Sequence, residues 1–198
     1  SRESIRQRLG LGKKVLLFFG FIRPYKGLDL LLKAFCELSP KYKDLSLLIV
    51  GEQFGSSVDQ LSEKEKFLKG CPSNDPVRGR VVWIDHYVAN EEVGHYFTVA
   101  DALVAPYLSV TQSGPIQIAY AFDKPVIASD LPAFRECVSE GESGYLFETG
   151  NASDLAKKIK LFFSKPVSSE NVKRFRKKFD WDTYADLILG TGTLTIKQ

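Results

Sequence analysis

Residues 15–28 of the chain read VLLFFGFIRPYKGL, and this stretch decides the fold. An apolar run of strand length, Val15–Phe19, is followed by leucines at helical spacing that begin just after Gly27. A strand, a short loop and a helix in this order predict one corner of a parallel α/β sheet, at the edge where such sheets bind ligands. Arg23 and Lys26 add two cations beside a helix N-terminus, which itself attracts anions. The stretch therefore predicts a phosphate-binding corner.

The rest of the chain repeats the alternation of short apolar runs and helical patterns. Strands are predicted at Val15–Phe19, Leu45–Val50, Val81–Ile84, Ala102–Ala105 and Pro125–Ala128, with a short element at Gly144–Phe147. Helices are predicted at about Ser1–Leu9, Gly27–Leu38, Val58–Leu68, Asn90–Val99, Pro115–Phe122, Ala152–Phe163, Ser169–Lys177 and Thr183–Leu189. This alternation predicts right-handed crossovers and a parallel sheet with helices on both faces. The fold class is therefore α/β, a single doubly wound, Rossmann-like domain over residues 1–198.

Composition excludes several classes of protein. A chain of 198 residues with 44% hydrophobic content can bury the core of one ordinary domain. Its 27 basic and 24 acidic residues leave a net charge of +3, too balanced to indicate nucleic acid binding. Cys36, Cys71 and Cys137 lack the spacing of a metal site or a disulfide framework, so we expect no metal and a reducing, cytoplasmic setting. Because the chain has no methionine, even at position 1, we expect it to begin inside a longer polypeptide.

A second strand–helix corner is predicted after Ala102–Ala105. Residues 106–115 read PYLSVTQSGP, and a proline near a helix start after serine or glycine is a typical N-terminal signal. Thr111, Ser113 and Gly114 are small, so they leave room for a ligand at the backbone. Both corners belong to the same edge of the sheet, where their helix ends can act on one anion. Taken alone, each corner also has a plain explanation, as solvated cations or as a helix cap.

Four segments match, in order and spacing, a known family. They are residues 19–27 (FGFIRPYKG), 48–52 (LIVGE), 100–107 (ADALVAPY) and 114–136 (GPIQIAYAFDKPVIASDLPAFRE), the last continuing to 141–146 (GESGYL). Together they resemble the C-terminal, donor-binding domain of the GT-B glycosyltransferases, a large retaining family that uses nucleotide sugars. The resemblance implies that the chain is the nucleotide-sugar-binding half of such an enzyme. An N-terminal, acceptor-binding domain would then lie outside residues 1–198.

The resemblance also assigns roles to the cations of the first corner. Lys26 occupies the position of the family's diphosphate-binding lysine, and Arg23 lies in the same loop. The arginine that usually follows the loop glycine is replaced by Phe21. We therefore expect Arg23 and Lys26 to be the catalytic residues, which stabilise the charge on the departing diphosphate. Gly20 and Gly27, which flank them, are expected to contact the substrate.

Other positions depart from the family pattern. Its two glutamates, eight residues apart, align with Val110 and Ile118, and neither is acidic. The hydrogen bonds of these glutamates to the donor sugar and ribose would fall to Thr111, Gln112 or Gln117, at neutral and therefore weaker strength. The family's glycine before the Pro-Val strand is replaced by Asp123, beside Lys124. Ser113, Gly114 and His86 complete the expected substrate contacts. His86 is included because it lies in the loop where the family places groups near the nucleotide base; the alternative is a surface histidine without a function.

The hypothesis from the sequence is a hexosyltransferase domain that uses a UDP- or GDP-linked sugar, without another cofactor, in polysaccharide or glycolipid synthesis. We expect the domain alone to be inactive without its N-terminal domain. The basic run 173–178 (KRFRKK) is either a solvated helix face or a peripheral contact with an anionic membrane and a lipid-linked acceptor. Two alternatives stay open. One is a non-catalytic nucleotide-binding or scaffold domain, favoured by Val110 and Ile118; the other is half of a nucleotide-sugar epimerase, with His86 and Glu136 as acid–base candidates.

Overall fold

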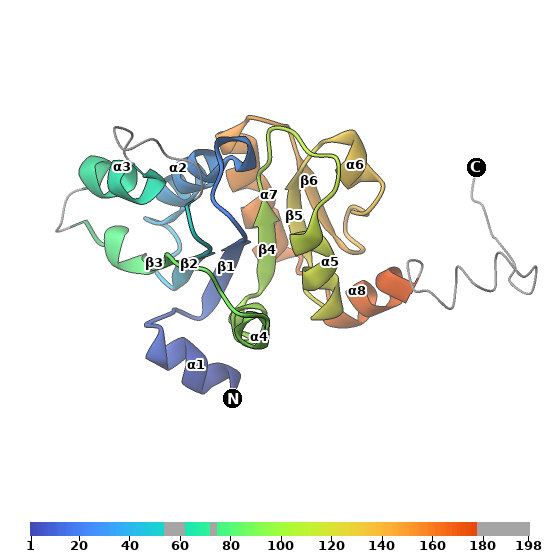
Figure 1. Cartoon of the computed structure of the whole chain (residues 1–198). Helices are drawn as coiled ribbons and strands as arrows, with labels where there is room; N and C mark the ends of the chain where they lie inside the picture. The colour runs from blue at the N-terminus through green and yellow to red at the C-terminus, as the bar shows by residue number, and fades with distance from the viewer. Residues whose placement is uncertain (54–61, 72–74, 178–198) are drawn as a thin grey trace, which may run out of the picture.

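The structure is a computed structural model that describes residues 1–53, 62–71 and 75–177 (Figure 1). Its centre is a parallel sheet of six strands in the order β3-β2-β1-β4-β5-β6. The strands are β1 (Lys14–Phe19), β2 (Leu45–Val50), β3 (Val81–Ile84), β4 (Ala102–Ala105), β5 (Val126–Ser129) and β6 (Gly144–Phe147). The chain builds the sheet outward from β1 in one direction and then, from β4, in the other. The carboxyl ends of β1 and β4 therefore flank the switch point at which open α/β sheets bind ligands.

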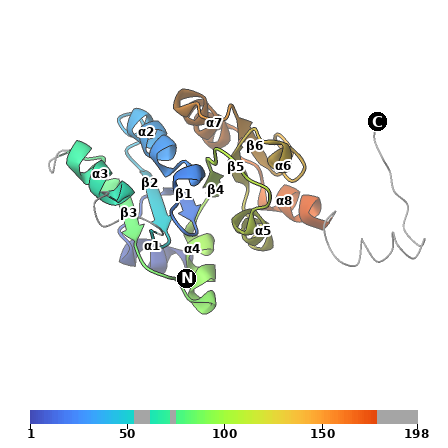
Figure 2. The ribbon, with the colours of Figure 1, turned by 45° about the horizontal axis from the view of Figure 1, so that its top comes forward.

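Helices cover both faces of this sheet, as Figure 2 shows. They are α1 (Arg2–Arg8), α2 (Leu28–Leu38), α3 (Glu63–Gly70), α4 (Asn90–Val99), α5 (Gly114–Ala121), α6 (Pro132–Arg135), α7 (Ala152–Ser164) and α8 (Ser169–Arg176), with 3-10 turns η1 (Pro24–Lys26) and η2 (Arg78–Arg80). Helix α2 packs against α7 on one face, and α1 packs against α4 on the other. The predicted Rossmann-like, doubly wound fold is confirmed.

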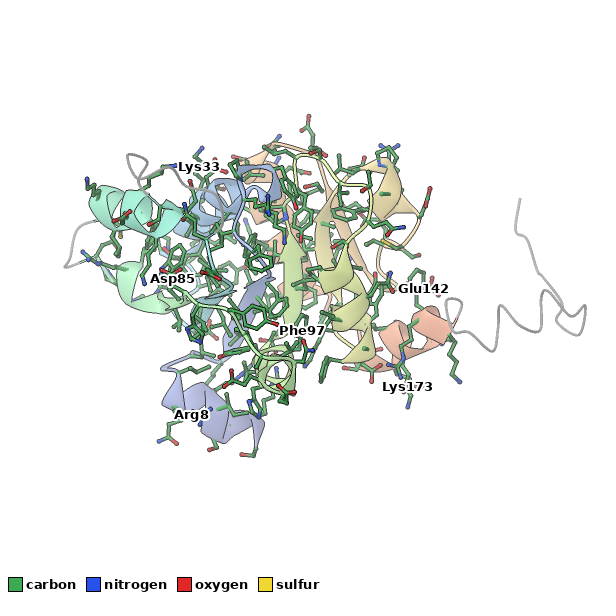
Figure 3. The ribbon with its side chains drawn as sticks, in the orientation of Figure 1. Arg8, Lys33, Asp85, Phe97, Glu142 and Lys173 are labelled. Atoms are coloured by element: carbon green, nitrogen blue, oxygen red, sulfur yellow. The ribbon has the colours of Figure 1, made fainter. Side chains whose placement is uncertain are left out.

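The apolar runs form strands because every strand but the outer β3 is covered on both faces. All six residues of β2 are buried, and four consecutive residues in β1 are fully inaccessible to solvent. Parallel strands with two covered faces read as continuous apolar runs rather than as alternating patterns. On the α4 side, the ring of Phe97 fills the space between helix and sheet, with its centroid 5.0 Å from that of Phe19 and 5.7 Å from that of Phe122 (Figure 3).

Some helix boundaries differ from expectation. The helix expected over Val58–Leu68 begins at Glu63, because Ser62 and Glu65 form a capping box: Glu65 N donates to the Ser62 hydroxyl and Ser62 N donates to the Glu65 carboxylate. The single-turn helix α6 was not expected, since one turn is too short to show a helical period. The helix predicted at Thr183–Leu189 lies outside the described residues.

The turn before β5 has a left-handed residue at the position where the resemblance implies a glycine. Asp123 occupies that position with φ at 53°, in the left-handed region that glycine adopts without strain. The residue therefore holds a glycine-like turn at some energetic cost.

Within the described ranges, no helix is long and apolar enough to cross a bilayer.

Candidate functional site

The two predicted corners are joined at the carboxyl edge of the sheet (Figure 1). Leu108 N, in the loop after β4, donates a hydrogen bond of 2.7 Å to the carbonyl oxygen of Tyr25 in η1. The rings of Tyr25 and Tyr107 meet edge to face, with centroids 6.2 Å apart. At Gly27, where φ is 63°, a Cβ would lie 2.0 Å from the carbonyl oxygen of Pro106. Glycine at this position therefore lets the start of α2 lie directly against the β4 loop.

Lys26 lies inside this joint rather than in solvent. The residue is only 8% exposed, and its ammonium lies over the ring of Tyr107, 5.3 Å from the centroid. A Cβ on Gly20, at the end of β1, would be 2.9 Å from Lys26 Nζ and 3.6 Å from Pro115 Cγ in the first turn of α5. The ammonium is therefore held between the end of β1 and the start of α5, so that both corners border it.

The electrostatic environment of Lys26 is unfavourable to its charge. Burial, and after it the charge of Arg23, lowers the pKa of Lys26 from 10.5 to about 8. No acidic side chain of the described residues contributes to this shift. Burial also raises the pKa of Tyr107 to about 12, so the ring below the ammonium stays a neutral phenol. A buried ammonium without a counter-ion gains most from an anion that binds beside it.

A hollow of about 510 Å³ opens at the start of α5. The predicted contacts Thr111, Gln112, Ser113, Gly114 and Gln117 all line it, and α6 with the residues after it closes the other side through Ala133, Phe134, Glu136 and Cys137. Ser113 is the residue before the helix, but its side chain makes no capping hydrogen bond. The helix begins where the sequence signals predict, but the alternative of a side-chain cap is not supported, and the corner is shaped by the extended backbone of Ser113 and by the proline that follows Gly114.

A second, smaller hollow of about 190 Å³ is lined in part by Gly20. Its walls are mainly apolar and come from the ends of β1 and β2, the start of α4 and Ile118 in α5. Two rings at its rim are exposed to solvent, Phe21 by 42% and Tyr87 by 64%. Ile118 thus contributes to an apolar wall at the position where the resemblance implied a carboxylate.

The structure does not bring all the predicted contacts together. Arg23 is exposed and precedes η1, and its charge acts on Lys26. His86 is exposed and lines neither hollow, whereas its neighbour Tyr87 lines the smaller one. Val110 is half-buried and packs against the core. Among the residues that the structure describes, no three His, Cys, Asp or Glu side chains are placed to hold a metal ion.

Comparison with known proteins now gives the family. Residues 1–179 match the model for glycosyl transferases group 1. The chain belongs to this family. A phosphatidyl-myo-inositol mannosyltransferase from Mycobacterium leprae is 30% identical over 190 residues, which cover 90% of this chain and 46% of the relative. The chain thus spans about half the length of the curated relatives that it matches.

Solved structures show which fold this chain shares with other glycosyltransferases. The C-terminal domain of the Francisella tularensis protein LpcC, from the same family, superposes with a TM-score of 0.77 at 21% identity, covering 90% of this chain and 92% of that domain. Anabaena HepE, crystallised with UDP, gives a TM-score of 0.78 at 21% identity, covering 96% of this chain and 51% of HepE. The predicted likeness to the C-terminal domain of a GT-B glycosyltransferase is confirmed.

Several residues of this group 1 site were missed by the sequence analysis. Tyr107, which lies under the Lys26 ammonium, is an aromatic residue at the carboxyl end of β4, and that placement alone could have singled it out. Glu136 was considered as the end of the fourth matching segment and as an acid–base candidate of the epimerase alternative, but not as a substrate contact, and it lines the larger hollow. Its approach depends on α6, which has no sequence signal of its own.

Proposed function

We propose that this chain is the donor-binding half of a glycosyltransferase, which binds a UDP- or GDP-linked sugar at the joint between η1 and α5. The observation that carries the proposal is Lys26, a nearly buried ammonium with a lowered pKa and no acidic side chain of the described residues to account for its burial. Anabaena HepE, which has the same fold, was crystallised with UDP and with UDP-glucose. A nucleoside diphosphate supplies the negative charge that this corner lacks.

In this proposal the first corner acts as the electrostatic catalyst. When the glycosidic bond to the diphosphate breaks, negative charge grows on the departing oxygen. Lys26, held in place by the Tyr107 ring and Gly20, faces that charge without having to reorganise, and Arg23 adds a second charge at the same corner. The bound diphosphate raises the pKa of Lys26 again, which keeps the ammonium protonated through the reaction.

The larger hollow is proposed to hold the sugar. It joins hydroxyl and amide groups from Thr111, Gln112 and Gln117 to the Glu136 carboxylate. Sugar hydroxyls both donate and accept hydrogen bonds, so neutral groups of both kinds can bind them, with Glu136 as the stronger acceptor. Transfer with retention to a glycan or glycolipid acceptor is part of the proposal, and the M. leprae relative, named for phosphatidyl-myo-inositol, supports a lipid-linked acceptor.

A non-catalytic nucleotide-binding domain is the second candidate, because one observation favours it. Ile118 contributes to a mainly apolar wall near Gly20, so one of the two expected carboxylates is replaced by a side chain that cannot hydrogen bond. The epimerase alternative has less support. His86 lies outside both hollows, which leaves Glu136 without a partner for acid–base chemistry.

Calorimetry with UDP, GDP and ADP, with chelator present throughout, tests the proposed site. We expect one of the three to bind without metal, since the site consists of side-chain cations and backbone N–H groups. Transfer is then tested by offering a panel of nucleotide sugars to the chain alone and to the full-length polypeptide. We expect activity only in the latter, because a donor half alone cannot position an acceptor. Binding without transfer in both would favour the non-catalytic candidate, and absence of binding in both would refute the site.

A further inference from the structure

A third cavity, of about 380 Å³, lies at the amino edge of the sheet. The proposed nucleotide site around Lys26, called the nucleotide corner below, lies at the opposite, carboxyl edge. The segments that precede β1, β4 and β5 meet there, together with the end of α7 and the start of α8. Its charged lining consists of the cations Arg2, Lys13, Lys14 and Lys124 and the single carboxylate Asp101. The proposed donor site uses none of these residues.

The negative charge in this region is already committed to other contacts. Asp101 accepts hydrogen bonds from Arg2 Nη2 at 2.5 Å, from Arg6 Nη2 at 3.1 Å and from Val15 N at 2.7 Å. Lys14 is paired with Asp44 at 3.1 Å. The fold therefore uses both carboxylates to hold α1 and β1 in place, and positive charge is left over in the cavity.

Two donors that line the cavity are incompletely satisfied. Arg2 is paired with Asp101 through Nη2, but its Nε is buried, and no described residue accepts a hydrogen bond from it. Lys124 Nζ donates one long hydrogen bond, 3.3 Å, to the carbonyl oxygen of Thr98. Burial lowers the pKa of Lys124, and the charge of Arg2 lowers it further, against the opposing effect of Asp101. An anion in the cavity would relieve this repulsion.

We propose that this amino-edge cavity binds a phosphate group, as free phosphate, as part of a small phosphorylated molecule or as a lipid headgroup. Arg2, Lys13 and Lys124 approach from separate segments, and Ser168 and Ser169 add hydroxyl groups at the start of α8. A tetrahedral dianion offers oxygens in enough directions to meet donors on several sides, which the two oxygens of a carboxylate do not. The site is distinct from the nucleotide corner and can be occupied at the same time.

Inorganic phosphate is the first probe, used with the whole chain at constant ionic strength. The Arg23→Ala/Lys26→Ala variant serves as background, because it lacks the cations of the nucleotide corner. We expect saturable binding by calorimetry, weakened roughly tenfold or more by Lys13→Gln/Lys124→Gln. The matched control is Lys33→Gln/Lys69→Gln, which removes the same charge from α2 and α3. Lys124→Arg, which keeps the charge, should keep the affinity and shows whether a loss reflects folding.

Vesicles distinguish the two sources of the phosphate group. Phosphatidylcholine vesicles that contain phosphatidic acid carry phosphate monoesters, and vesicles with phosphatidylserine at matched charge do not. If the protein sediments preferentially with the phosphatidic acid vesicles, and if free phosphate or Lys13→Gln/Lys124→Gln abolishes this, the ligand is a lipid headgroup. If the protein binds phosphate but no vesicles, the ligand is a soluble molecule. The proposal is overturned if neither probe binds, if phosphate binding disappears in the Arg23→Ala/Lys26→Ala background, or if Lys13→Gln/Lys124→Gln binds as tightly as the control.

Discussion

Among the described residues, Arg6 and Lys26 are the two charged side chains that are nearly buried, at 9% and 8% exposure, and they lie at opposite edges of the sheet. Arg6 donates to the carbonyl oxygens of Val99 and Lys13 and forms an ion pair with Asp101. The ammonium of Lys26 lies over an aromatic ring, and the charge that contributes to its lowered pKa, that of Arg23, has the same sign. The two buried charges therefore differ in their partners: the charge of Arg6 is paired within the fold, whereas no acidic side chain of the described residues acts on Lys26, which we propose binds a diphosphate.

The largest effect on stability is expected at the satisfied cation. Asp101→Ala removes the carboxylate that pairs with Arg2 and Arg6 and that accepts from Val15 N. A buried cation left without its partner is strongly destabilising, so the free energy of unfolding should fall by about 3 kcal/mol. Asp44→Ala, which breaks only the more exposed pair with Lys14, should cost less than about 1 kcal/mol. Denaturant titration measures both, and equal losses would contradict the comparison.

Lys26→Ala should show the opposite behaviour. The free energy of unfolding should not fall, because the desolvated charge costs the fold free energy below pH 8, and removing it offsets the lost packing of the side chain. Affinity for a nucleoside diphosphate should fall by about 1.5–3 kcal/mol, the range for hydrogen bonds to charged groups. Lys33→Ala is the matched control, since Lys33 projects from α2 into solvent (Figure 3). If calorimetry finds unchanged affinity in Lys26→Ala, the corner is only a well-formed strand–helix junction.

Arg23→Ala tests how much Arg23 contributes to diphosphate affinity and to the lowered pKa of Lys26. Its loss of diphosphate affinity should be near 1.5 kcal/mol, the low end for charged hydrogen bonds, because Arg23 is exposed. The substitution should also raise the pKa of Lys26, since the charge of Arg23 is the second cause of its depression. The pH midpoint of binding should therefore move upward. A lower affinity with an unmoved midpoint would mean that Arg23 contacts the ligand without influencing Lys26.

The pH dependence of binding tests the protonation state of Lys26. Binding needs the protonated ammonium, and the pKa of free Lys26 is about 8. Affinity should be constant below pH 8 and should fall above it, by up to about tenfold per pH unit, because the free protein must then take up a proton. The stability of the free domain should change in the opposite sense. Between about pH 8 and the unfolded value of 10.5 the unfolded state binds more protons, so the free energy of unfolding rises with pH.

Lys26→Ala supplies the reference for both pH measurements. In this variant the affinity should lose its slope between pH 8 and 10.5, and the stability should lose only the part of its slope that Lys26 contributes, since Lys124 also has a lowered pKa. If the affinity of the variant falls with pH as steeply as that of the unmodified chain, the slope arises from another group, and the lowered pKa of Lys26 has no part in binding.

The sheet could be predicted from the sequence because its signals are local. Runs such as Val15–Phe19 are continuous and apolar, as is typical of a strand covered on both faces, and this run is followed by a helical period. The grouping of 111–117 around one hollow also followed, since parallel strands bring their carboxyl ends to one edge. In contrast, α6 depends on a single proline-led turn, and its contribution of Glu136 to the hollow could not be predicted.

The burial of Lys26 could not be predicted for a different reason. A lysine in a loop is normally solvated, and nothing within residues 23–27 distinguishes this one. Its environment comes from Tyr107, some eighty residues away in the chain, and from the closeness that Gly27 permits to Pro106. Likewise, the apolar wall beside Ile118 is composed of segments from four elements. Such features depend on which loops the topology brings together.

Gly20 restricts the order in which substitutions at this corner can arise. Because a Cβ there would lie 2.9 Å from Lys26 Nζ, any side chain at position 20 must displace the ammonium. The steric part of that penalty exists only while Lys26 is present, so the two positions should show epistasis in a double-mutant cycle. The backbone part, set by a φ of 101° at Gly20, remains in either background. A lineage could therefore replace Gly20 at lower cost only after it had already given up Lys26, and with it the charge that this corner offers.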